Sequence, residues 1–343
     1  MRFDLGRIGP YGLALLTTVL LAACGGGGPV DPVVTGPAPS PPAAAATRVP
    51  APPPGAERTV PTVTPAASPT PASTPLAPPK GVPEPTPGVP PAPHASDAQL
   101  QARIKAIVGD AAPSYGIYVQ NLDDGTGAGI NQDEVYPAAS IFKLYVMWEA
   151  FRQESLGVLS FDETMEVTAY YKAFDVGTEL VKEGQVVTVA EALDLMMVSS
   201  DTPTAVLLQD RLGFRNINAA LAALGITNSG LFYPDNPPSA TARDVGVLLR
   251  AIAGGGVLPP ESHDAMVALL LSGVPDNGLR AGVPADVEVG HKTGFLDGAQ
   301  HDAGIVFMEG SPYILVAMWD RESGENLIEQ ISREVYEYYA RGR

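Results

Sequence analysis

Proline is concentrated in one stretch of the chain, and that stretch limits which residues can fold. The segment from Pro29 to Ala95 is 67 residues long and holds 23 of the 35 prolines, with no Phe, Trp or Tyr. A segment with so little apolar surface to bury cannot offset the entropy that it would lose on ordering. We therefore predict an extended, disordered tether over residues 25–95, which leaves residues 96–343 as the folded module.

The first 24 residues predict export and a lipid anchor. Two arginines precede an apolar run over residues 11–21, which is the layout of a secretory signal and is too short to span a bilayer. The run leads into Leu-Ala-Ala-Cys, which resembles the bacterial lipoprotein box, in which the lipidated Cys (here Cys24) becomes the new N-terminus. Cys24 is the only cysteine, so the module has no disulfide, and we expect it on the periplasmic or extracellular face of the cell envelope. The alternative is an ordinary cleavage site with an unrelated Cys nearby.

The folded module is strongly acidic. It contains 34 of the 38 acidic residues and 16 of the 21 basic ones, which gives a net charge of −18. Such a surface repels polyanions, so we exclude nucleic acid as a partner. The sequence has neither a His and Cys cluster with metal-site spacing nor a phosphate-binding glycine loop, so we expect no metal and no cofactor. We expect a monomer.

Hydrophobic periodicity and turn signals divide the module into a sheet built from both ends of the chain and a helical middle. Strands are predicted over residues 114–122, 128–136, 286–294, 301–309 and 313–319. Helices are predicted over 96–109, 140–154, 188–198, 204–212, 215–224, 241–253, 262–271 and 325–341. Capping patterns begin three of them, at Ser96/Gln99, Thr188/Glu191 and Thr241/Asp244. The fold class is therefore α/β (α+β), with a five-stranded antiparallel sheet flanked by helices (residues 96–136 and 280–343) and an all-helical lobe (residues 137–279).

Ser140 and Lys143 stand three residues apart in the largely apolar stretch YPAASIFKLYVMWEA. Pro137 disfavours helix at the residue before it, so the helix begins near Ala139 and Ser140 lies in its first turn. Backbone N–H groups and the helix dipole favour a developing oxyanion there, and Lys143 follows one turn later on the same face. A partly desolvated Lys can take the proton of a serine nucleophile. The alternative is structural, with Ser140 capping the helix and Lys143 snorkelling to the surface.

Two further motifs follow in order. The pair Ser200-Asp201 lies between two predicted helices, 60 residues after Ser140, and Lys292–Gly294 lies on a predicted strand 92 residues beyond Ser200. Each motif is unremarkable alone. With Ser140 and Lys143 they resemble the Ser-x-x-Lys, Ser-Asp-Asn and Lys-Thr-Gly set of class A β-lactamases and penicillin-binding proteins. The resemblance covers the whole module and implies a β-lactamase-like fold.

The resemblance also implies a role for each motif residue. Ser140 is acylated by the carbonyl of a β-lactam or of a related, peptidoglycan-like D-Ala-type amide, while Lys143 and Ser200 transfer protons. On the substrate side, it implies that Asp201 buttresses the turn, Thr202 stands in the place of the Asn, Lys292 and Thr293 receive a carboxylate, and Gly294 leaves room for substrate along the strand. The main-chain N–H groups of Ser140 and Phe295 form the oxyanion hole.

Two departures from the family pattern concern Thr202 and the loop over residues 227–244. Thr202 is shorter than the expected Asn and lacks its amide, so it is a poor bridge between Lys143 and substrate. The loop corresponds to the omega loop, where class A enzymes carry a Glu that activates the deacylating water, and it contains no Glu. Asp235 is the one acid in the middle of the loop and has a shorter reach. We therefore expect acylation followed by slow deacylation, or deacylation by another route.

Three functions are compatible with these residues. The first is a serine hydrolase that opens β-lactams through Ser140. The second is a penicillin-binding-like D-Ala peptidase or esterase that β-lactams trap, and the third is a catalytically impaired lipoprotein that binds in the cell envelope. His291 and His301, on neighbouring predicted strands, could approach each other and build a Ser-His-Asp triad, but sheet packing explains them with fewer assumptions.

Overall fold

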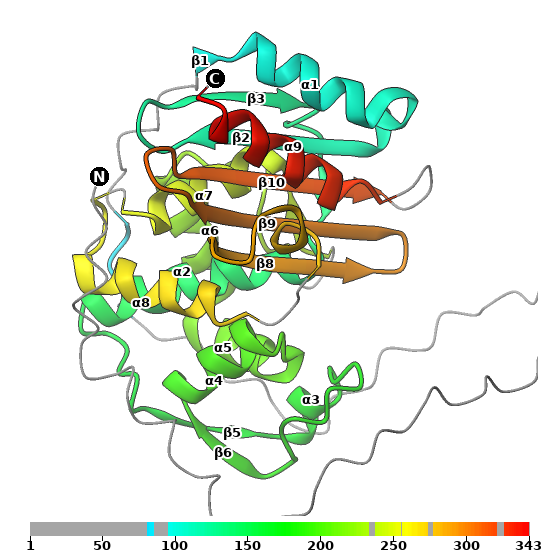
Figure 1. Cartoon of the computed structure of the whole chain (residues 1–343). Helices are drawn as coiled ribbons and strands as arrows, with labels where there is room; N and C mark the ends of the chain where they lie inside the picture. Colours follow the sequence, from blue (N-terminus) through cyan, green and yellow to red (C-terminus); the bar gives the residue numbers. More distant parts are fainter. Residues whose placement is uncertain are drawn as a thin grey trace, which may run out of the picture. The chain divides into compact units, whose positions relative to one another are not determined.

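The segments predicted as strands form one sheet in the computed structural model (Figure 1). Its strand order is β1 (Ala95–Ser96), β3 (Thr126–Ile130), β2 (Tyr115–Asn121), β10 (Tyr313–Asp320), β9 (Ala299–Phe307) and β8 (Glu288–Leu296). The five longer strands pair antiparallel, as predicted, whereas β1 pairs parallel to β3. The sheet is therefore mixed and has one strand more than predicted, because a two-residue strand is too short to show a period-two pattern.

The structure describes residues 81–85, 95–232, 237–254, 256–273, 277–320 and 326–342. The predicted signal peptide, Cys24 and all of the predicted tether except residues 81–85 and Ala95 lie outside these ranges. Within the described ranges, no helix has the length and apolar character needed to cross a membrane.

The predicted helices are present in the predicted order, and one short α-helix, α3 (Ala169–Lys172), is additional. The α-helices in the described part are α1 (Ala98–Val108), α2 (Lys143–Ser155), α3 (Ala169–Lys172), α4 (Val189–Val198), α5 (Thr202–Leu212), α6 (Phe214–Ala223), α7 (Ala242–Ile252), α8 (Pro260–Leu271) and α9 (Ile328–Ala340). Short 3-10 helices are η2 (Gly109–Ser114), η3 (Ala139–Phe142) and η4 (Arg280–Gly282). Two small ladders pair β4 (Tyr136–Pro137) with β7 (Ser239–Ala240) and β5 (Thr164–Val167) with β6 (Gln185–Thr188). Neither ladder is predicted, because strands of two to four residues show too little periodicity.

Helix α1 begins one residue later than its predicted capping box. Asp97, not Ser96, is its N-cap, and the Asp97 carboxylate accepts from the N–H groups of Gln99 and Leu100 at 3.1 and 3.0 Å. Ser96 is already used as part of β1, so the capping-box prediction is wrong here. The boxes at Thr188/Glu191 and Thr241/Asp244 were predicted at the right residues, and Thr188 forms both bonds of a capping box.

Successive residues of β10 point to opposite faces of the sheet. Ile314, Val316 and Met318 belong to the hydrophobic cluster of the helical lobe, and the residues between them belong to a second cluster with α1 and α9. This is the period of two expected of a strand, and burial on both faces explains why β10 is apolar throughout. Figure 1 shows α1 and α9 in front of the sheet and α7 behind it, with α3, α4 and α5 below.

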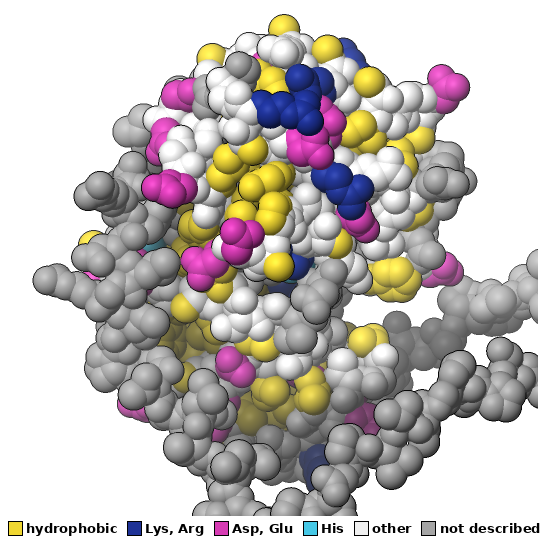
Figure 2. Space-filling model, viewed as in Figure 1, with side chains coloured by type: hydrophobic (Ala, Val, Ile, Leu, Met, Phe, Trp, Pro, Cys, Tyr) yellow, Lys and Arg dark blue, Asp and Glu magenta, His cyan; other side chains and the backbone are white. Residues whose placement is uncertain are grey.

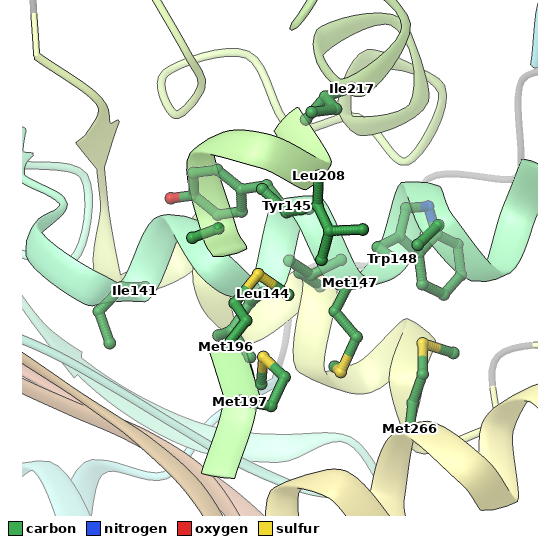
Figure 3. Close-up of a cluster of buried hydrophobic side chains, with 14 of the residues drawn as sticks. Ile141, Leu144, Tyr145, Met147, Trp148, Met196, Met197, Leu208, Ile217 and Met266 are labelled. Atoms are coloured by element: carbon green, nitrogen blue, oxygen red, sulfur yellow. The ribbon is translucent and has the colours of Figure 1, made fainter. Parts of the chain in front are cut away.

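Helix α2 is the centre of the helical lobe. All of its residues from Lys143 to Gln153 are buried, including four that are polar or charged, namely Lys143, Glu149, Arg152 and Gln153. Figure 3 shows its side chains packed among those of α4, α5 and α8; the labelled residues are Leu144, Tyr145, Met147 and Trp148 of α2, Met196 and Met197 of α4, Leu208 of α5 and Met266 of α8. Lys143 is fully buried, so the alternative of a snorkelling surface cation is wrong.

A buried ion pair between Glu149 and Arg152 lies near the C-terminal end of α2. The carboxylate of Glu149 accepts two bonds from the Arg152 guanidinium, at 2.6 and 2.8 Å, and one from Gln153 at 2.8 Å. Burial raises the pKa of Glu149, and the bonds from Arg152 oppose this. Arg152 also donates to the carbonyl of Pro83 at 3.2 Å, so a short piece of the predicted tether contacts the folded module.

The surface charges over α1 and α9 are mixed in sign. On the face shown in Figure 2, Lys and Arg side chains lie beside Asp and Glu side chains in this region, where Arg103 pairs with Glu334 at 2.8 Å and Arg333 pairs with Glu329. Exposed pairs of this kind contribute only about 0–1 kcal/mol each. The two hydrophobic clusters therefore contribute far more to the fold than these pairs do.

Candidate active site

Ser140 lies on a turn that is attached to distant parts of the chain. The helical stretch begins at Ala139, as predicted, but its first turn is the 3-10 helix η3 and α2 follows from Lys143. The N–H of Ala138 donates to the carbonyl of Pro238 at 2.8 Å, next to the β4–β7 ladder. Ala139 has a φ of +47°, a left-handed conformation that costs about 1–2 kcal/mol for a residue with a Cβ. We refer to residues 138–142 as the Ser140 turn.

Ser200 lies on a second turn with a left-handed residue, between α4 and α5. Here Ser200 itself has a φ of +58°. Asp201 caps α5, and its carboxylate accepts from the N–H and hydroxyl of Thr204 at 2.9 and 2.8 Å and from the hydroxyl of Thr178 at 3.1 Å. Asp201 is fully buried, so it supports the turn from the protein interior. We refer to residues 199–201 as the Ser200 turn.

The hydroxyl of Ser200 is the point at which the three motifs meet. It donates to Oγ of Ser140 at 3.2 Å and accepts from Nζ of Lys143 at 3.0 Å and Nζ of Lys292 at 3.1 Å. Lys143 also donates to the carbonyl of Ser200. Among the described residues, no hydrogen bond joins Lys143 directly to Ser140. The two are connected through Ser200.

Burial lowers the pKa of both lysines. The pKa of Lys143 falls from 10.5 to about 7, chiefly through loss of solvent and further through the charge of Lys292, while Asp201 opposes the shift. The pKa of Lys292 falls to about 8 for the same main reason. Between pH 7 and 10.5 the unfolded chain binds a proton at Lys143 that the folded chain lacks, so the free energy of unfolding rises with pH over this interval.

Strand β8 runs beside the Ser140 turn at Gly294. A Cβ placed on Gly294 would lie 3.1 Å from Cβ of Ala139 and 3.1 Å from Cγ1 of Ile141, closer than ordinary packing allows. Glycine therefore lets the strand and the turn touch. Thr293 is half-buried, whereas Phe295, on the other side of Gly294, is 63% exposed.

The two histidines of the sheet have separate partners. Nδ1 of His291 lies 2.8 Å from Oδ1 of Asp302, and the other oxygen of Asp302 accepts from the N–H of Leu279 at 2.8 Å. His301 bonds through Nε2 to the carbonyl of Pro137 at 2.8 Å. Neither ring is hydrogen-bonded to Ser140 in the described structure, so the two histidines pack in the sheet and do not build the triad considered above.

Thr202 and Asp235 belong to the two places where the sequence departs from the family pattern. Thr202 reaches Nζ of Lys143 only at 3.5 Å, the long limit of a hydrogen bond, which agrees with the expectation that Thr is a poor bridge. Asp235 lies within residues 233–236, outside the described residues, so its role as a base stays a prediction. Just before residues 233–236, the side chain of Asn218 accepts from the N–H of Leu231 at 2.9 Å and donates to the carbonyl of Leu231 at 2.7 Å.

Sequence reasoning missed the contribution of Thr178. Its hydroxyl donates a hydrogen bond to Asp201, and its N–H donates to the carboxylate of Asp175, which also accepts from the N–H of Gly177. The loop between α3 and β6 carries no motif and its contact with Asp201 is 23 residues away in sequence. Only the Asp-x-Gly-Thr composition, typical of a turn, could have directed attention to it.

Comparison with known proteins places the chain in a family. The sequence model of the β-lactamase enzyme family matches residues 99–339 of this chain. The chain belongs to the β-lactamase enzyme family. It is 26% identical to β-lactamase 1 of Bacillus cereus over 270 residues, which cover 73% of this chain and 84% of that one. It is 27% identical to β-lactamase AST-1 of Nocardia asteroides over 232 residues, which cover 62% and 72% of the two chains.

Solved structures support the same assignment for the fold of this β-lactamase family member. It superimposes on PBP-A with a TM-score of 0.67 and 27% identity, covering 73% of this chain and 99% of that one. A mutant of PBP-A, solved as an acyl-enzyme complex with penicillin G, gives a TM-score of 0.68 at 27% identity over the same shares. The resemblance that three short motifs indicate is confirmed, and the chain is a serine hydrolase related to class A β-lactamases and PBP-A.

Proposed function

We propose that the module is an acyl-transfer enzyme that opens β-lactams, or related D-Ala-type amides, at Ser140 and releases the acyl group slowly. The observation that carries this proposal is the Ser140–Ser200 contact of 3.2 Å, with both lysine Nζ atoms bonded to the Ser200 hydroxyl. A serine in this setting has a neighbour that can receive its proton, which a serine hydroxyl needs in order to act as a nucleophile.

The proton route follows from the donors and acceptors around Ser200. When Lys143 is the neutral amine, the Ser200 hydroxyl can rotate so that it accepts from Ser140 and donates to Lys143. The Ser140 Oγ–carbon bond then forms and the lactam C–N bond breaks, while Ser200 passes the proton held by Lys143 to the leaving nitrogen. Lys143 starts as an amine and ends as one, so the step is balanced. Its pKa of about 7 makes the amine available at neutral pH.

Substrate binding is assigned to β8 and the Ser140 turn. Lys292, as a cation, and the hydroxyl of Thr293 receive the carboxylate of the substrate. The N–H groups of Ser140 and Phe295 hold the carbonyl oxygen as it becomes negative. Support comes from the packing of Gly294 against Ala139 and Ile141, which brings this part of β8 next to the nucleophile.

Slow release of the acyl group is supported by the lack of a Glu in the loop sequence, and of a carboxylate among the described partners of the two lysines, that could act as the base for the attacking water. The loop over residues 227–244 has no Glu. In the described structure, the hydrogen-bond partners of Lys143 and Lys292 are serine and threonine atoms and include no carboxylate. A water that attacks the acyl-enzyme needs a base, and Asp235 is the remaining acid in the middle of the loop. We therefore place this enzyme nearer to the penicillin-binding function than to rapid β-lactam turnover.

The decisive experiment is intact-protein mass spectrometry of the full chain after addition of penicillin G, followed over time. Ring opening loses no fragment, so the expected adduct has the full mass of penicillin G and persists for many minutes. Ser140→Ala abolishes the adduct, and peptide mapping of the wild-type chain locates it on Ser140. Ser155→Ala, on the last turn of α2, is a matched control that should be labelled normally.

Each other outcome selects a different function. An adduct that forms and disappears within seconds, with stoichiometric excess of opened penicillin, means true β-lactamase turnover and overturns the slow release. No adduct at all favours the catalytically impaired, envelope-binding lipoprotein. Adduct formation by the Ser140→Ala chain would refute the assignment of the nucleophile.

Export and lipidation at Cys24 form a separate proposal, which rests on the sequence alone. We propose that the chain is exported and anchored to the cell envelope, on its periplasmic or extracellular face, by lipid on Cys24, with the proline-rich segment as a spacer. Metabolic labelling with a fatty acid should mark the wild-type chain and not Cys24→Ala. Labelling of the Ala variant would contradict the proposal.

A further inference from the structure

His301 forms a side-chain contact between the sheet and the Ser140 turn. It lies on β9, directly opposite Gly294 of β8, and its ring is 1% exposed. Nε2 lies 2.8 Å from the carbonyl oxygen of Pro137, and Nδ1 lies 3.3 Å from the backbone N of Trp319. The ring also packs against the edge of Tyr136, with centroids 5.9 Å apart. One side chain thus connects β10, β9 and the residues that enter the Ser140 turn.

These two contacts define one protonation state of the ring. A carbonyl oxygen can only accept, so Nε2 carries the hydrogen, and the N–H of Trp319 can only donate, so Nδ1 has none. Burial also lowers the pKa of His301, while the bonds to the backbone of Pro137 and of Gln300 oppose this shift, and the lowered pKa agrees with a neutral ring.

The hydrogen bond from His301 to Pro137 matters because Pro137 lies close to Ser140 in the chain. Pro137 is three residues before Ser140, and the strained Ala139 lies between them. A left-handed alanine persists only where its surroundings hold it. The Ser140 turn is attached to residues 238–240 on one side by backbone bonds. On the sheet side, His301 supplies a polar attachment next to the close packing of Gly294.

We propose that His301 is a positioning residue for acylation. Its Nε2–H holds the entry to the Ser140 turn against β9, and so sets the distance between the Ser140 N–H and the Phe295 N–H. This inference rests on the proposed function, because these two groups form the proposed oxyanion hole. Oxyanion stabilisation depends on donors placed within a few tenths of an ångström of the developing charge. Loss of the bond should therefore slow acylation while substrate binding is kept.

The test separates the two hydrogen bonds of the ring with three substitutions. His301→Asn keeps an acceptor for Trp319 but cannot reach Pro137, His301→Gln restores a donor near the Nε2 position, and His301→Leu removes both. Acylation by penicillin G is measured by quenched mass-spectrometric time courses over a range of concentrations. These give the acylation rate constant and the apparent dissociation constant separately, with the melting temperature measured in parallel.

We expect His301→Asn and His301→Leu to lower the acylation rate constant at least tenfold with less than a threefold change in the dissociation constant. His301→Gln should recover to within about threefold of wild type. A rate constant of wild-type size in His301→Asn, or a Gln variant as slow as Leu at equal folded fraction, would overturn the proposal.

His263 provides the matched control for a buried histidine with a purely structural place. It lies on α8, is 7% exposed, and contacts the carbonyls of Ile252 and Leu258 at 3.2 and 3.0 Å. His263→Gln should lower the melting temperature without changing the acylation rate constant of the folded fraction. If it slows acylation as much as His301→Asn does, the positioning role is lost.

A spectroscopic measurement keeps the proposal testable if no variant folds or if penicillin G does not acylate the wild-type chain. In imidazole ¹⁵N spectra of the wild-type chain, His301 should show a protonated Nε2 and an unprotonated Nδ1 near neutral pH. The opposite tautomer would overturn the positioning role whatever the enzyme's substrate is. Absence of acylation with the expected tautomer would instead count against the proposed function alone.

Discussion

The two turns that present serines to each other are held in different ways. In the Ser200 turn, the left-handed residue is the serine itself, and the neighbouring Asp201 secures it through Thr204 and Thr178. In the Ser140 turn, the left-handed residue is Ala139, and the restraint comes from Pro238, β8 and His301. The Ser200 turn is held mainly by side chains within the helical lobe, and the Ser140 turn is held by segments 100 to 164 residues away.

The two turns therefore depend on different parts of the molecule for their conformation. The Ser200 turn carries its own cap in Asp201, and the partners of that cap, Thr204 and Thr178, lie within 23 residues of it. The Ser140 turn instead depends on contacts with the sheet, whose strands β8 and β9 come late in the chain. The position of Ser140 therefore depends on the joint between the sheet and the helical lobe.

The largest expected effect tests the shared hydroxyl. Ser200→Ala should slow acylation by about 10²–10⁴-fold, the range of a lost proton-transfer group, because Lys143 then has no link to Ser140. The measurement is the acylation time course with penicillin G. Ser199→Ala, next to it and exposed, should behave as wild type. A Ser200→Ala chain that acylates within threefold of wild type would mean that Lys143 reaches Ser140 by another path.

The next effect concerns the cap of the Ser200 turn. Asp201→Ala should lower the free energy of unfolding by about 2–4 kcal/mol, since it removes a helix cap and leaves the buried Thr204 hydroxyl without its acceptor. Thr178→Val should cost about 1 kcal/mol, the value of one hydrogen bond, and Thr178→Ser should restore most of it. Urea denaturation measures each value. Equal stability of Asp201→Ala and wild type would show that the turn does not depend on its cap.

The third prediction uses the charges of the two lysines. Acylation should rise about tenfold per pH unit below about 7, as Lys143 loses its proton, and fall above about 8, as Lys292 loses its charge. Lys292→Arg keeps its charge at high pH, so its profile should keep the acid limb and lose the alkaline one. A profile of Lys292→Arg that still falls above pH 8 would assign that limb to another group.

Most of the fold could be predicted from the sequence because long elements carry their own periodicity. Strands such as β10 and helices such as α7 lie within two residues of their predicted bounds. The parts that were not predicted are β1, the β4–β7 and β5–β6 ladders and the helix α3, and each of these strands and this helix has only two to four residues. Residues 128–136 were predicted as strand, but β3 ends at Ile130, and Asn131 follows with a φ of +44°.

The residues of the site also differ in how well the sequence predicts them. Three motifs locate the four groups that meet at Ser200, since their residue types and order are written in the sequence. The supporting residues are not readable in this way, because the partner of Asp201 is a loop threonine and the partner of Pro137 is a histidine 164 residues later. Such pairs exist only once the chain has folded. The sequence therefore indicates the motif residues that meet at the site, whereas the residues that hold them in place are found only in the structure.

The smallest expected effect tests whether the Ser140 turn is strained. Ala139→Gly removes a left-handed penalty of about 1–2 kcal/mol and adds a backbone-entropy cost of about 0.5–1 kcal/mol, so the free energy of unfolding should rise by about 0.5 kcal/mol. The matched control is Ala138→Gly, where φ is −64° and the same substitution should lower stability by about 0.5–1 kcal/mol. Opposite signs at two adjacent alanines, measured by urea denaturation, would show that strain is confined to the residue before Ser140. If both variants lose stability equally, Ala139 is not strained, and the turn needs no restraint from the sheet to keep its shape.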